Sequence, residues 1–424
     1  MSEYIDNVSR RERQLKAIIL QLHEGKDPEQ VKTAFAEMLA DVGPDEVVRI
    51  EEALVAEGLD PTQIQPLCDL HVALFREALD SHPAPETVPG HPVFAFRAEN
   101  LGVVRVLEQL KRALEEIGRH PTTETIREAR EILDKLQIYD RHYVRKENLL
   151  FPYLEHTGFT GPSKVMWGIH NEIRALWKEL RRILNESPTP VNLNRALEVF
   201  TALDHTIREM IYKEERILFP AALERLTEED WSAIRAQEDE IGFAYARPGR
   251  SWRGTDDARE AQEEHPQNAP ATGSREAENA LIALEVGALT VEQIDMMLNT
   301  LPVDITFVDE EDRVRYFSQT AERIFPRSPA IIGRKVQNCH PPQSVDKVQA
   351  ILDDFRAGKR DVAEFWIQFT PSWQEQKSAN ERQFIHIRYF ALRDSSGIYR
   401  GTLEVTQNLT HLRKLKGERR LLDD

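Results

Sequence analysis

Histidine and glutamate side chains recur at inward-facing positions of one predicted set of helices, where they could bind metal ions. These residues are Glu99, His142, Glu147, His170, His205, Glu209, Glu214 and Glu215. Carboxylates and imidazoles that several helices contribute to one bundle core are the ligands of dinuclear metal sites. A buried carboxylate without a partner is costly, and a bound metal ion removes that cost. The mixture of oxygen and nitrogen donors favours iron or manganese over an all-thiolate zinc site.

The sequence that ends two of these helices occurs twice. The segment KENLLFP (146–152) matches EERILFP (214–220) in its glutamate and in its Leu-Phe-Pro ending. The starts of the other two helices also match, and in this alignment Glu99 corresponds to His170. This pattern predicts a quasi-duplicated pair of helical hairpins.

Four long amphipathic segments carry these residues, and short connections join them. The segments cover roughly 93–118, 121–156, 162–186 and 190–226. Helices that follow one another with such short connections form an antiparallel four-helix bundle. The sequence therefore predicts an all-α bundle at the centre of the chain.

The bundle lies between two other predicted domains. Short helices with Asx-Pro starts precede it, and a polar stretch with proline, glycine and no periodicity follows it. After this stretch, two β-rich runs, a helix and three further strands predict a sensor-like α+β module. The predicted domains are 1–80 (small helical domain), 88–245 (bundle), 246–276 (linker) and 277–424 (α+β module).

Two cysteine–histidine pairs lie outside the bundle. Cys68 and His71 share one face of a predicted helix, and Cys339 directly precedes His340. Either pair could contact a metal or haem. Because a buried free cysteine usually behaves as a small hydrophobic residue, the sequence favours structural roles and leaves haem as the weaker alternative.

Segment 91–226 resembles the hemerythrin-like HHE cation-binding family, whose helices end in E-x-x-LFP about one turn after a histidine. The resemblance implies a non-haem di-iron centre. The metal ligands that it and the helix pattern together suggest are His91, Glu99, His142, Glu147, His170, His205, Glu214 and Glu215.

Two residues depart from the family pattern. Lys146 occupies the usual glutamate position after His142, and Met210 occupies the usual histidine position four residues before Glu214. In the first helix either His91 or Glu99 could be the ligand. A site with two metals, one metal or none remains open at this stage.

The resemblance extends to both flanks of the bundle. Residues 1–80 resemble the small helical domain of unknown function that often precedes such bundles, and residues 290–414 resemble a PAS domain. The expected fold is therefore multi-domain, with an all-α N-terminal helical domain, a four-helix hemerythrin-like bundle and an α+β PAS domain.

Composition limits the class of protein. The 424 residues carry a net charge of −17, which argues against binding to nucleic acid or to an anionic membrane surface. Two cysteines do not make a disulfide framework, and no apolar run approaches ~18 residues. The N-terminal residues contain no export signal, so a cytoplasmic protein is expected.

The predicted function is that of a sensor or signalling protein. Its di-iron centre would respond to oxygen, nitric oxide or redox state, and the PAS module would relay the signal to an unidentified protein partner or through a homodimer. One alternative is a di-iron enzyme that reduces oxygen, peroxide or nitric oxide. Another is a metal-free scaffold, which Lys146 and Met210 allow.

Overall fold

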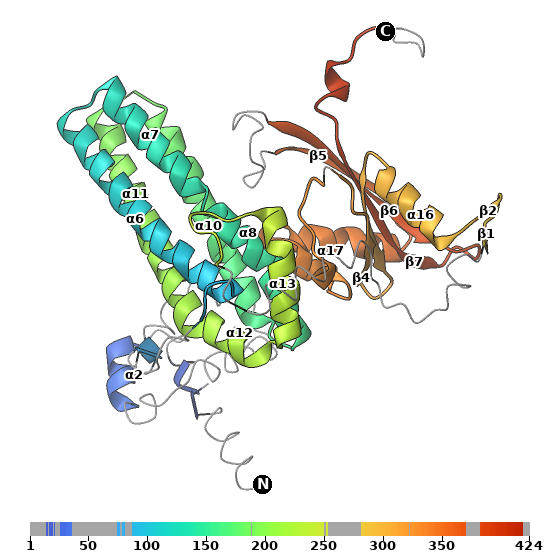
Figure 1. The fold of residues 1–424 in the computed structure, drawn as a ribbon, viewed down its shortest axis with the longest axis horizontal. Coiled ribbons are helices and arrows are strands. Elements are labelled where there is room, and N and C mark those ends of the chain that lie inside the picture. Colours follow the sequence, from blue (N-terminus) through green and yellow to red (C-terminus); the bar gives the residue numbers. More distant parts are fainter. Residues whose placement is uncertain are drawn as a thin grey trace. The chain divides into compact units, whose positions relative to one another are not determined.

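The structure is a computed structural model (Figure 1). It describes residues 14–15, 17–19, 21, 26–35, 74–76, 79–80, 87–187, 189–249, 252, 281–321, 323–369 and 382–418. The chain divides into two compact units, Met1–Gln262 and Glu263–Asp424. None of the described helices is long and apolar enough to cross a membrane.

Only part of the N-terminal segment lies within the described residues. Helix α2 (Pro28–Ala34) begins with proline after Asp27, as its sequence predicts. Arg76 binds both carboxylate oxygens of Glu209 at 2.8 and 3.0 Å, which ties this segment to the bundle. Cys68 and His71 lie outside the described residues.

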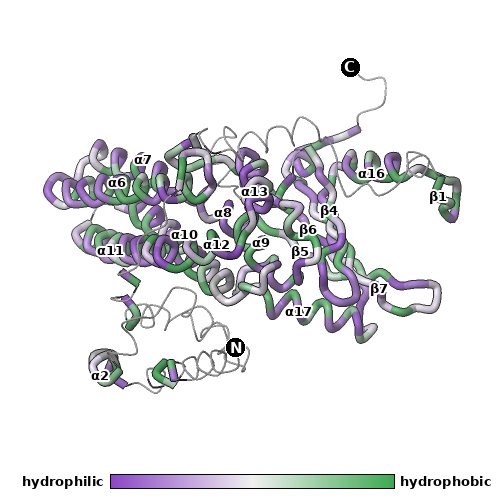
Figure 2. The backbone as a smooth tube through the Cα atoms, turned by 60° about the horizontal axis from the view of Figure 1, so that its bottom comes forward, coloured by the Kyte–Doolittle hydropathy of each residue, from purple (hydrophilic) through white to green (hydrophobic). Residues whose placement is uncertain are grey.

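The predicted four-helix bundle is confirmed. Its long helices are α6 (Pro92–Arg119), α7 (Thr123–Gln137), α10 (Gly161–Leu184) and α11 (Pro190–Lys213). Helices α6 and α10 each pack against both α7 and α11, which gives the antiparallel arrangement seen in Figure 1. Hydrophobic and hydrophilic residues alternate along these helices in Figure 2, because each helix buries one apolar face.

The repeated Leu-Phe-Pro segments form the same local structure twice. Helix α7 is followed by α8 (Asp140–Arg145), the π-helical turn η1 (Lys146–Leu150) and α9 (Phe151–His156). Helix α11 is followed in the same way by the π-helical turn η2 (Glu214–Leu218) and α12 (Phe219–Arg225). In both, the phenylalanine N–H donates to a carbonyl five residues back, Lys146 or Glu214.

Proline explains these widened turns. Pro152 and Pro220 have no N–H to donate, and their rings clash with the carbonyl four residues earlier. The helix therefore widens before each proline, as π-turns do. Lys146 and Glu214 begin the two turns and so occupy equivalent positions in the repeat.

A fifth helix, α13 (Glu228–Ile241), follows the bundle and was not separated by the sequence pattern. It begins at a capping box formed by Thr227 and Asp230. Trp231 and Ile234 are buried, so one side of this acidic helix faces the bundle.

The C-terminal unit has the predicted α+β fold. A short hairpin, β1 (Ile282–Ala283) and β2 (Ala288–Leu289), and helix α16 (Val291–Thr300) precede the sheet. The sheet contains β3 (Asp304–Asp309), β4 (Val314–Phe317), β5 (Val362–Phe369), β6 (Gln383–Arg393) and β7 (Tyr399–Asn408). Its order is β4-β3-β7-β6-β5, and every neighbouring pair is antiparallel.

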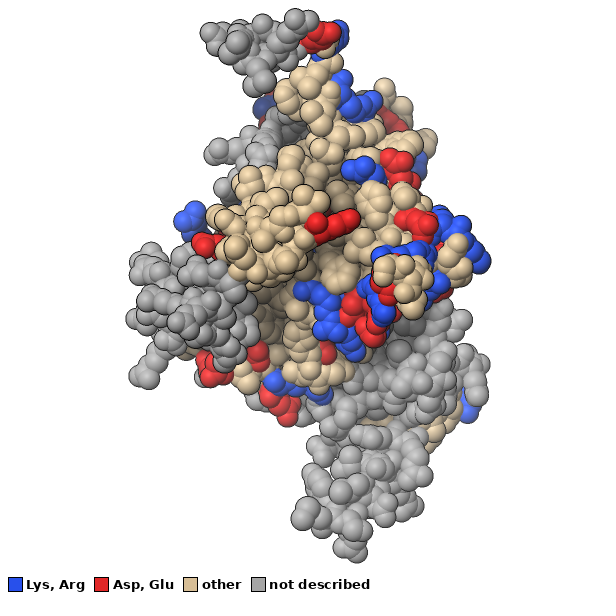
Figure 3. Space-filling model, turned by 90° about the vertical axis from the view of Figure 1, so that its right-hand side faces the viewer, with Lys and Arg blue, Asp and Glu red and all other residues tan. Residues whose placement is uncertain are grey.

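Helix α17 (Pro342–Arg356) contacts strand β7. Its Leu352 and Phe355 join two apolar clusters that also include Val308 and Ile385. Acidic and basic side chains lie next to one another on the face that Figure 3 shows. Such neighbours form ion pairs elsewhere in this unit, for example Arg393 with Asp361 at 2.8 Å.

Candidate cation site in the bundle

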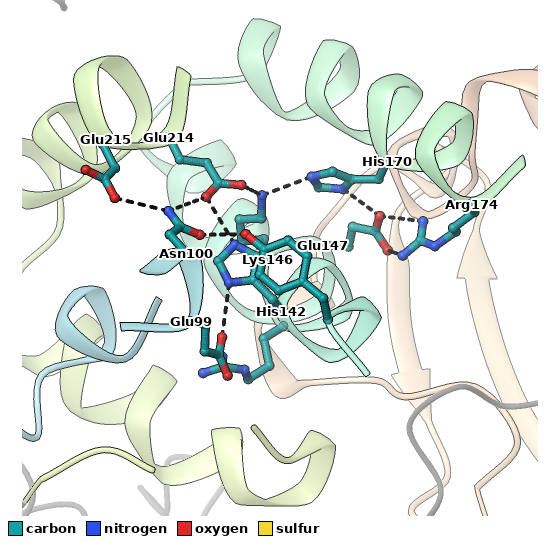
Figure 4. Close-up of polar contacts among 11 residues, drawn as sticks. Glu99, Asn100, His142, Lys146, Glu147, His170, Arg174, Glu214 and Glu215 are labelled. Carbon is teal, nitrogen blue, oxygen red and sulfur yellow. Dashed lines mark hydrogen bonds and ion pairs between the residues drawn. The ribbon is translucent and has the colours of Figure 1, made fainter. Parts of the chain in front are cut away.

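A cluster of charged side chains fills the centre of the bundle (Figure 4). Helix α6 contributes Glu99, α8 contributes His142 and Arg145, η1 contributes Lys146, α10 contributes His170, and η2 contributes Glu214. The structure buries all six side chains completely. Burial of so many charges is tolerated only where each has a partner of opposite charge.

His142 lies between two carboxylates. Its Nδ1 is 3.0 Å from Glu99 Oε2, and its Nε2 is 3.1 Å from Glu214 Oε2. Tyr139 stacks on the ring with centroids 4.6 Å apart. Because both nitrogens face carboxylates of the chain, neither points toward an open coordination position.

His170 has the environment typical of a metal-bound histidine. Its Nδ1 donates to Glu147 Oε1 at 2.8 Å, and its Nε2 faces Lys146 Nζ at 3.0 Å. Burial, together with the charges of Lys146 and Arg174, holds the pKa of His170 well below its usual value. The ring is therefore neutral, and Nε2 accepts a hydrogen bond from the lysine, where a metal-bound histidine would donate its lone pair to the metal.

Lys146 completes the centre of the cluster. Its ammonium pairs with Glu214 Oε1 and lies 4.9 Å from the centre of the Tyr143 ring. Burial raises the pKa of Glu214, but the charges of Lys146 and His142 outweigh it and hold that pKa well below the usual value. Burial also lowers the pKa of Lys146, and Glu214 opposes this effect.

The other buried carboxylates have arginine partners. Arg145 pairs with Glu99, and its Nη1 donates to Glu238 of α13 at 2.7 Å. Arg174 Nη1 donates to Glu147 at 2.8 Å. Burial, together with the nearby charge of Glu99, raises the pKa of Glu238 to about 7, although Arg145 and Arg235 act in the opposite direction.

The structure brings together five of the eight residues predicted as metal ligands, and Glu215 lies at the edge of the cluster. The five are Glu99, His142, Glu147, His170 and Glu214, as Figure 4 shows. The Glu215 side chain keeps 26% of its surface exposed and accepts from Asn100 Nδ2 at 3.4 Å.

His91 and His205 lie apart from the five. His91 caps helix α6, where its Nδ1 accepts from the Val93 N–H, and its ring packs against Trp231 and Trp252. His205 is exposed on α11.

The other cysteine–histidine pair lies in the C-terminal unit. Cys339 is buried, and its Sγ contacts the Lys335 carbonyl at 3.7 Å. Burial lowers the pKa of His340 to about 4, so that its ring is neutral. Neither the contact of Cys339 nor the pKa of His340 identifies a haem site, and haem binding by these residues stays a prediction.

Four charged residues in and around the cluster were not among the predicted ligands: Arg145, Lys146, Arg174 and Glu238. Lysine and arginine rarely occupy buried positions, so composition favours an exposed location for both. The repeat contained one usable signal, because Lys146 stands where the second copy has Glu214.

The residues as placed do not fit a dinuclear iron centre. Within the described part of the chain, no group of three or more histidine, cysteine, aspartate or glutamate side chains is arranged to hold a metal ion. His170 and Glu214 converge on a lysine nitrogen, while Glu99 and Glu147 face arginines. The cluster therefore resembles a cation site whose cations belong to the chain itself.

Comparison with protein families identifies all three parts of the chain. The family of unknown function DUF438 matches residues 15–81, the hemerythrin HHE cation binding domain matches 91–222, and the PAS domain matches 294–410. No curated protein matches the chain.

Several solved structures match about a third of the chain. A C-terminal domain from Streptococcus mutans has 32% identity over 33% of this chain and 99% of its own, with a TM-score of 0.29. The PAS domain of a Colwellia psychrerythraea protein has 11% identity over 28% and 97%, with a TM-score of 0.22. The PAS domain of Bordetella pertussis BvgS has 17% identity over 29% and 92%, with a TM-score of 0.23.

The order of these domains is the one that the resemblance of the sequence implied. The chain is thus a hemerythrin-like HHE protein with an N-terminal DUF438 segment and a C-terminal PAS domain.

Proposed function

We propose that this protein is a signalling protein in which the bundle exchanges a conformational signal with the PAS domain. The element that would transmit it is residues 227–249, which we call the strap. The hemerythrin match ends at residue 222, so the strap is an addition to the domain that the family model describes. Along the sequence, the strap leads from the bundle toward the PAS domain.

The observation that carries this proposal is the direct bonding of the strap to the buried charged cluster. Ala244 N–H donates to Glu99 Oε1 at 2.6 Å, and Glu238 accepts from Arg145 at 2.7 Å. Glu99 and Arg145 also bind each other, and Glu99 contacts His142. A movement of Glu99 or Arg145 would therefore change the hydrogen bonds that hold the strap against the bundle.

Aromatic contacts fix the rest of the strap. The Arg145 guanidinium lies 4.4 Å from the centre of the Phe243 ring, and Arg141 donates to the Phe243 carbonyl at 3.1 Å. Tyr245 donates to the Lys135 carbonyl at 3.0 Å. A Cβ atom at Gly102 would lie 2.7 Å from the Tyr245 ring, so a glycine stands where the strap crosses α6.

Coupling between two domains requires an element whose position both can bias. The strap meets this requirement on the bundle side, because buried ion pairs hold it against the bundle. Water cannot reach these charged groups to replace a broken ion pair. The PAS domain supplies the second module. An unidentified protein partner, a homodimer through the PAS domain and a cytoplasmic location are part of this proposal.

The nature of the input is a separate question. Oxygen, nitric oxide and redox sensing, and the di-iron enzyme alternative, all depend on bound iron, and they stay predictions from the sequence. Steady turnover of oxygen, peroxide or nitric oxide with a reductant would favour the enzyme. The metal-free alternative agrees best with the placement of Lys146.

Hydrogen exchange read by mass spectrometry on the full chain tests the relay. Glu99→Gln removes the charge that binds Arg145 and Ala244, and faster exchange is expected in the strap and in peptides beyond it. Glu179→Gln, an exposed ion-pair partner on α10, is the matched control and should leave the strap unchanged. Unchanged exchange in the strap of the Glu99 variant would contradict the proposal.

A further inference from the structure

We infer that the resident cation of this bundle is the ammonium group of Lys146, which stands where a HHE domain would hold a metal ion. The inference concerns only the core, and it holds whether or not the strap transmits a signal. It follows from the repeat, from the two hydrogen-bond acceptors that converge on Nζ, from the partners of both Glu214 oxygens and from the pairing of charges in the cluster.

The repeat shows which residues have been exchanged. Position 146 in the first copy corresponds to 214 in the second, and position 142 corresponds to 210. A quasi-symmetric pair of metals would take a donor from both members of each pair. In this chain each pair has only one such ligand. Glu214 is paired with Lys146, and His142 is paired with Met210, and neither Lys146 nor Met210 is suited to bind non-haem iron.

The two members of the first pair bind each other. Both begin a π-helical turn, and the turns bring the Lys146 ammonium onto Glu214 Oε1 in the centre of the bundle. A carboxylate pair at these positions would need an added cation between the two helices. A lysine–glutamate pair supplies that cation from one of the positions.

The surroundings of Nζ are those of a bound cation. Glu214 Oε1 and His170 Nε2 both face it, the latter at 3.0 Å. Glu147 orients the far side of the His170 ring at 2.8 Å, as carboxylates orient metal-bound histidines. The Tyr143 ring, 4.9 Å away, adds a third favourable contact for a positive charge.

Both oxygens of Glu214 already have partners within the chain. Oε1 is taken by Lys146, while Oε2 faces His142 at 3.1 Å and accepts from Asn100 Nδ2 at 3.0 Å. Met210 is completely buried where the family pattern has a histidine. The fourth helix therefore offers an apolar side chain and a carboxylate that is already bonded.

The charges of the cluster leave no need for an added metal. Lys146 pairs with Glu214, Arg145 pairs with Glu99 and Glu238, and Arg174 pairs with Glu147 and Asp140. Arg235 lies 3.9 Å from Glu238, so every one of these carboxylates has a basic partner in the chain. A divalent ion placed beside Glu214 would lie next to a fixed ammonium and would have to expel it. The bundle core is therefore complete without metal, and iron chemistry is not the source of any signal that it carries.

Metal analysis and thermal unfolding of the full chain test this inference. Wild-type protein from iron-rich culture should contain iron, manganese and zinc far below one ion per chain. Its unfolding midpoint should not move on addition of a chelator, Fe²⁺ or Zn²⁺. Stoichiometric metal retained through purification, or a midpoint raised by either ion, would overturn the inference.

Two substitutions at Lys146 supply the second arm. Lys146→Ala in chelator should lower the unfolding midpoint by on the order of 10 °C, since it leaves Glu214 buried without its cation. Zn²⁺ should then raise the midpoint of this variant, because His170 and Glu214 face a vacated position. An alanine variant as stable as wild type in chelator would also overturn the inference.

Lys146→Met keeps all but the last atom of the side-chain length and replaces the alanine variant if that variant does not fold. Lys178→Ala, at an exposed lysine of α10, is the matched control and should show neither effect. The wild-type arm requires no variant to fold. A failed relay would appear only in the exchange of the strap, so failure of the proposed function and failure of this inference are distinguishable.

Discussion

The ion pair between Lys146 and Glu214 can be measured by a double-substitution cycle. Lys146→Met removes the ammonium and leaves Glu214 fully buried, with His142 and Asn100 as its remaining partners. Removing one partner of a buried ion pair typically costs about 3–5 kcal/mol of unfolding free energy. Because two partners remain, we expect about 3 kcal/mol for Lys146→Met, and a similar loss for Glu214→Gln.

The double variant should lose much less than the sum of the two single losses. With both charges gone, no unpaired charge remains in the core, and such replacements are often close to neutral. We therefore expect a coupling free energy of at least about 2 kcal/mol. Urea unfolding of the full chain, followed by far-ultraviolet circular dichroism, reports on the bundle because most of the described helix lies there.

Arg182 and Glu179 provide the control cycle. They form an ion pair at 2.8 Å on the surface of α10, with side chains 48% and 31% exposed. Solvent-exposed pairs contribute little, so their cycle should show hardly any coupling. A coupling for Lys146 and Glu214 no larger than that of the control would refute the assignment of Lys146 as the cation of the core.

Three further predictions follow from the strap and the linker. The pKa of Glu238 rises from its usual value of 4.5 to about 7 in the folded protein. Between these two pH values the folded state therefore keeps a proton that the unfolded state has lost. The stability of wild type relative to Glu238→Gln should therefore fall by about 3 kcal/mol as pH rises from 4.5 through 7; a difference that is flat with pH would contradict this. Gly102→Ala should clash with Tyr245, lower the free energy of unfolding by about 1–3 kcal/mol and make the strap more sensitive to protease. Adding Tyr245→Ala to this variant should remove the clash and restore the protection of neighbouring peptides. Protease cleavage within 253–275 should release a folded bundle and a folded PAS domain, whereas one indivisible unfolding transition would show that these domains depend on each other.

Most of the fold could be predicted because it depends on local patterns. Amphipathic spacing and short connections specify the bundle, and alternating apolar residues between turns specify the strands of the C-terminal sheet. The sequence pattern did not predict helix α13 as a separate helix, because acidic residues dominate it and few apolar residues mark its buried side. Its contacts with the cluster come from positions distant in sequence, which no local pattern reveals.

The candidate site was predicted in part for the same reason. The helix pattern predicted that both His205 and Glu214 face inward, whereas the structure exposes His205 and buries Glu214. The helix pattern gave no sign that Lys146 points inward, because lysine is usually found at the surface. Two signals marked the position as exceptional, namely the departure of Lys146 from the family pattern and its alignment with Glu214 in the repeat.

The most direct measurement is a crystal structure of the full chain from iron-rich culture, with diffraction data collected at the iron absorption edge. We predict continuous density for the Lys146 side chain between His170 and Glu214, and no anomalous peak at that position. An anomalous peak bound by His170 and Glu214, with Lys146 turned away, would contradict the central claim that the chain supplies its own cation.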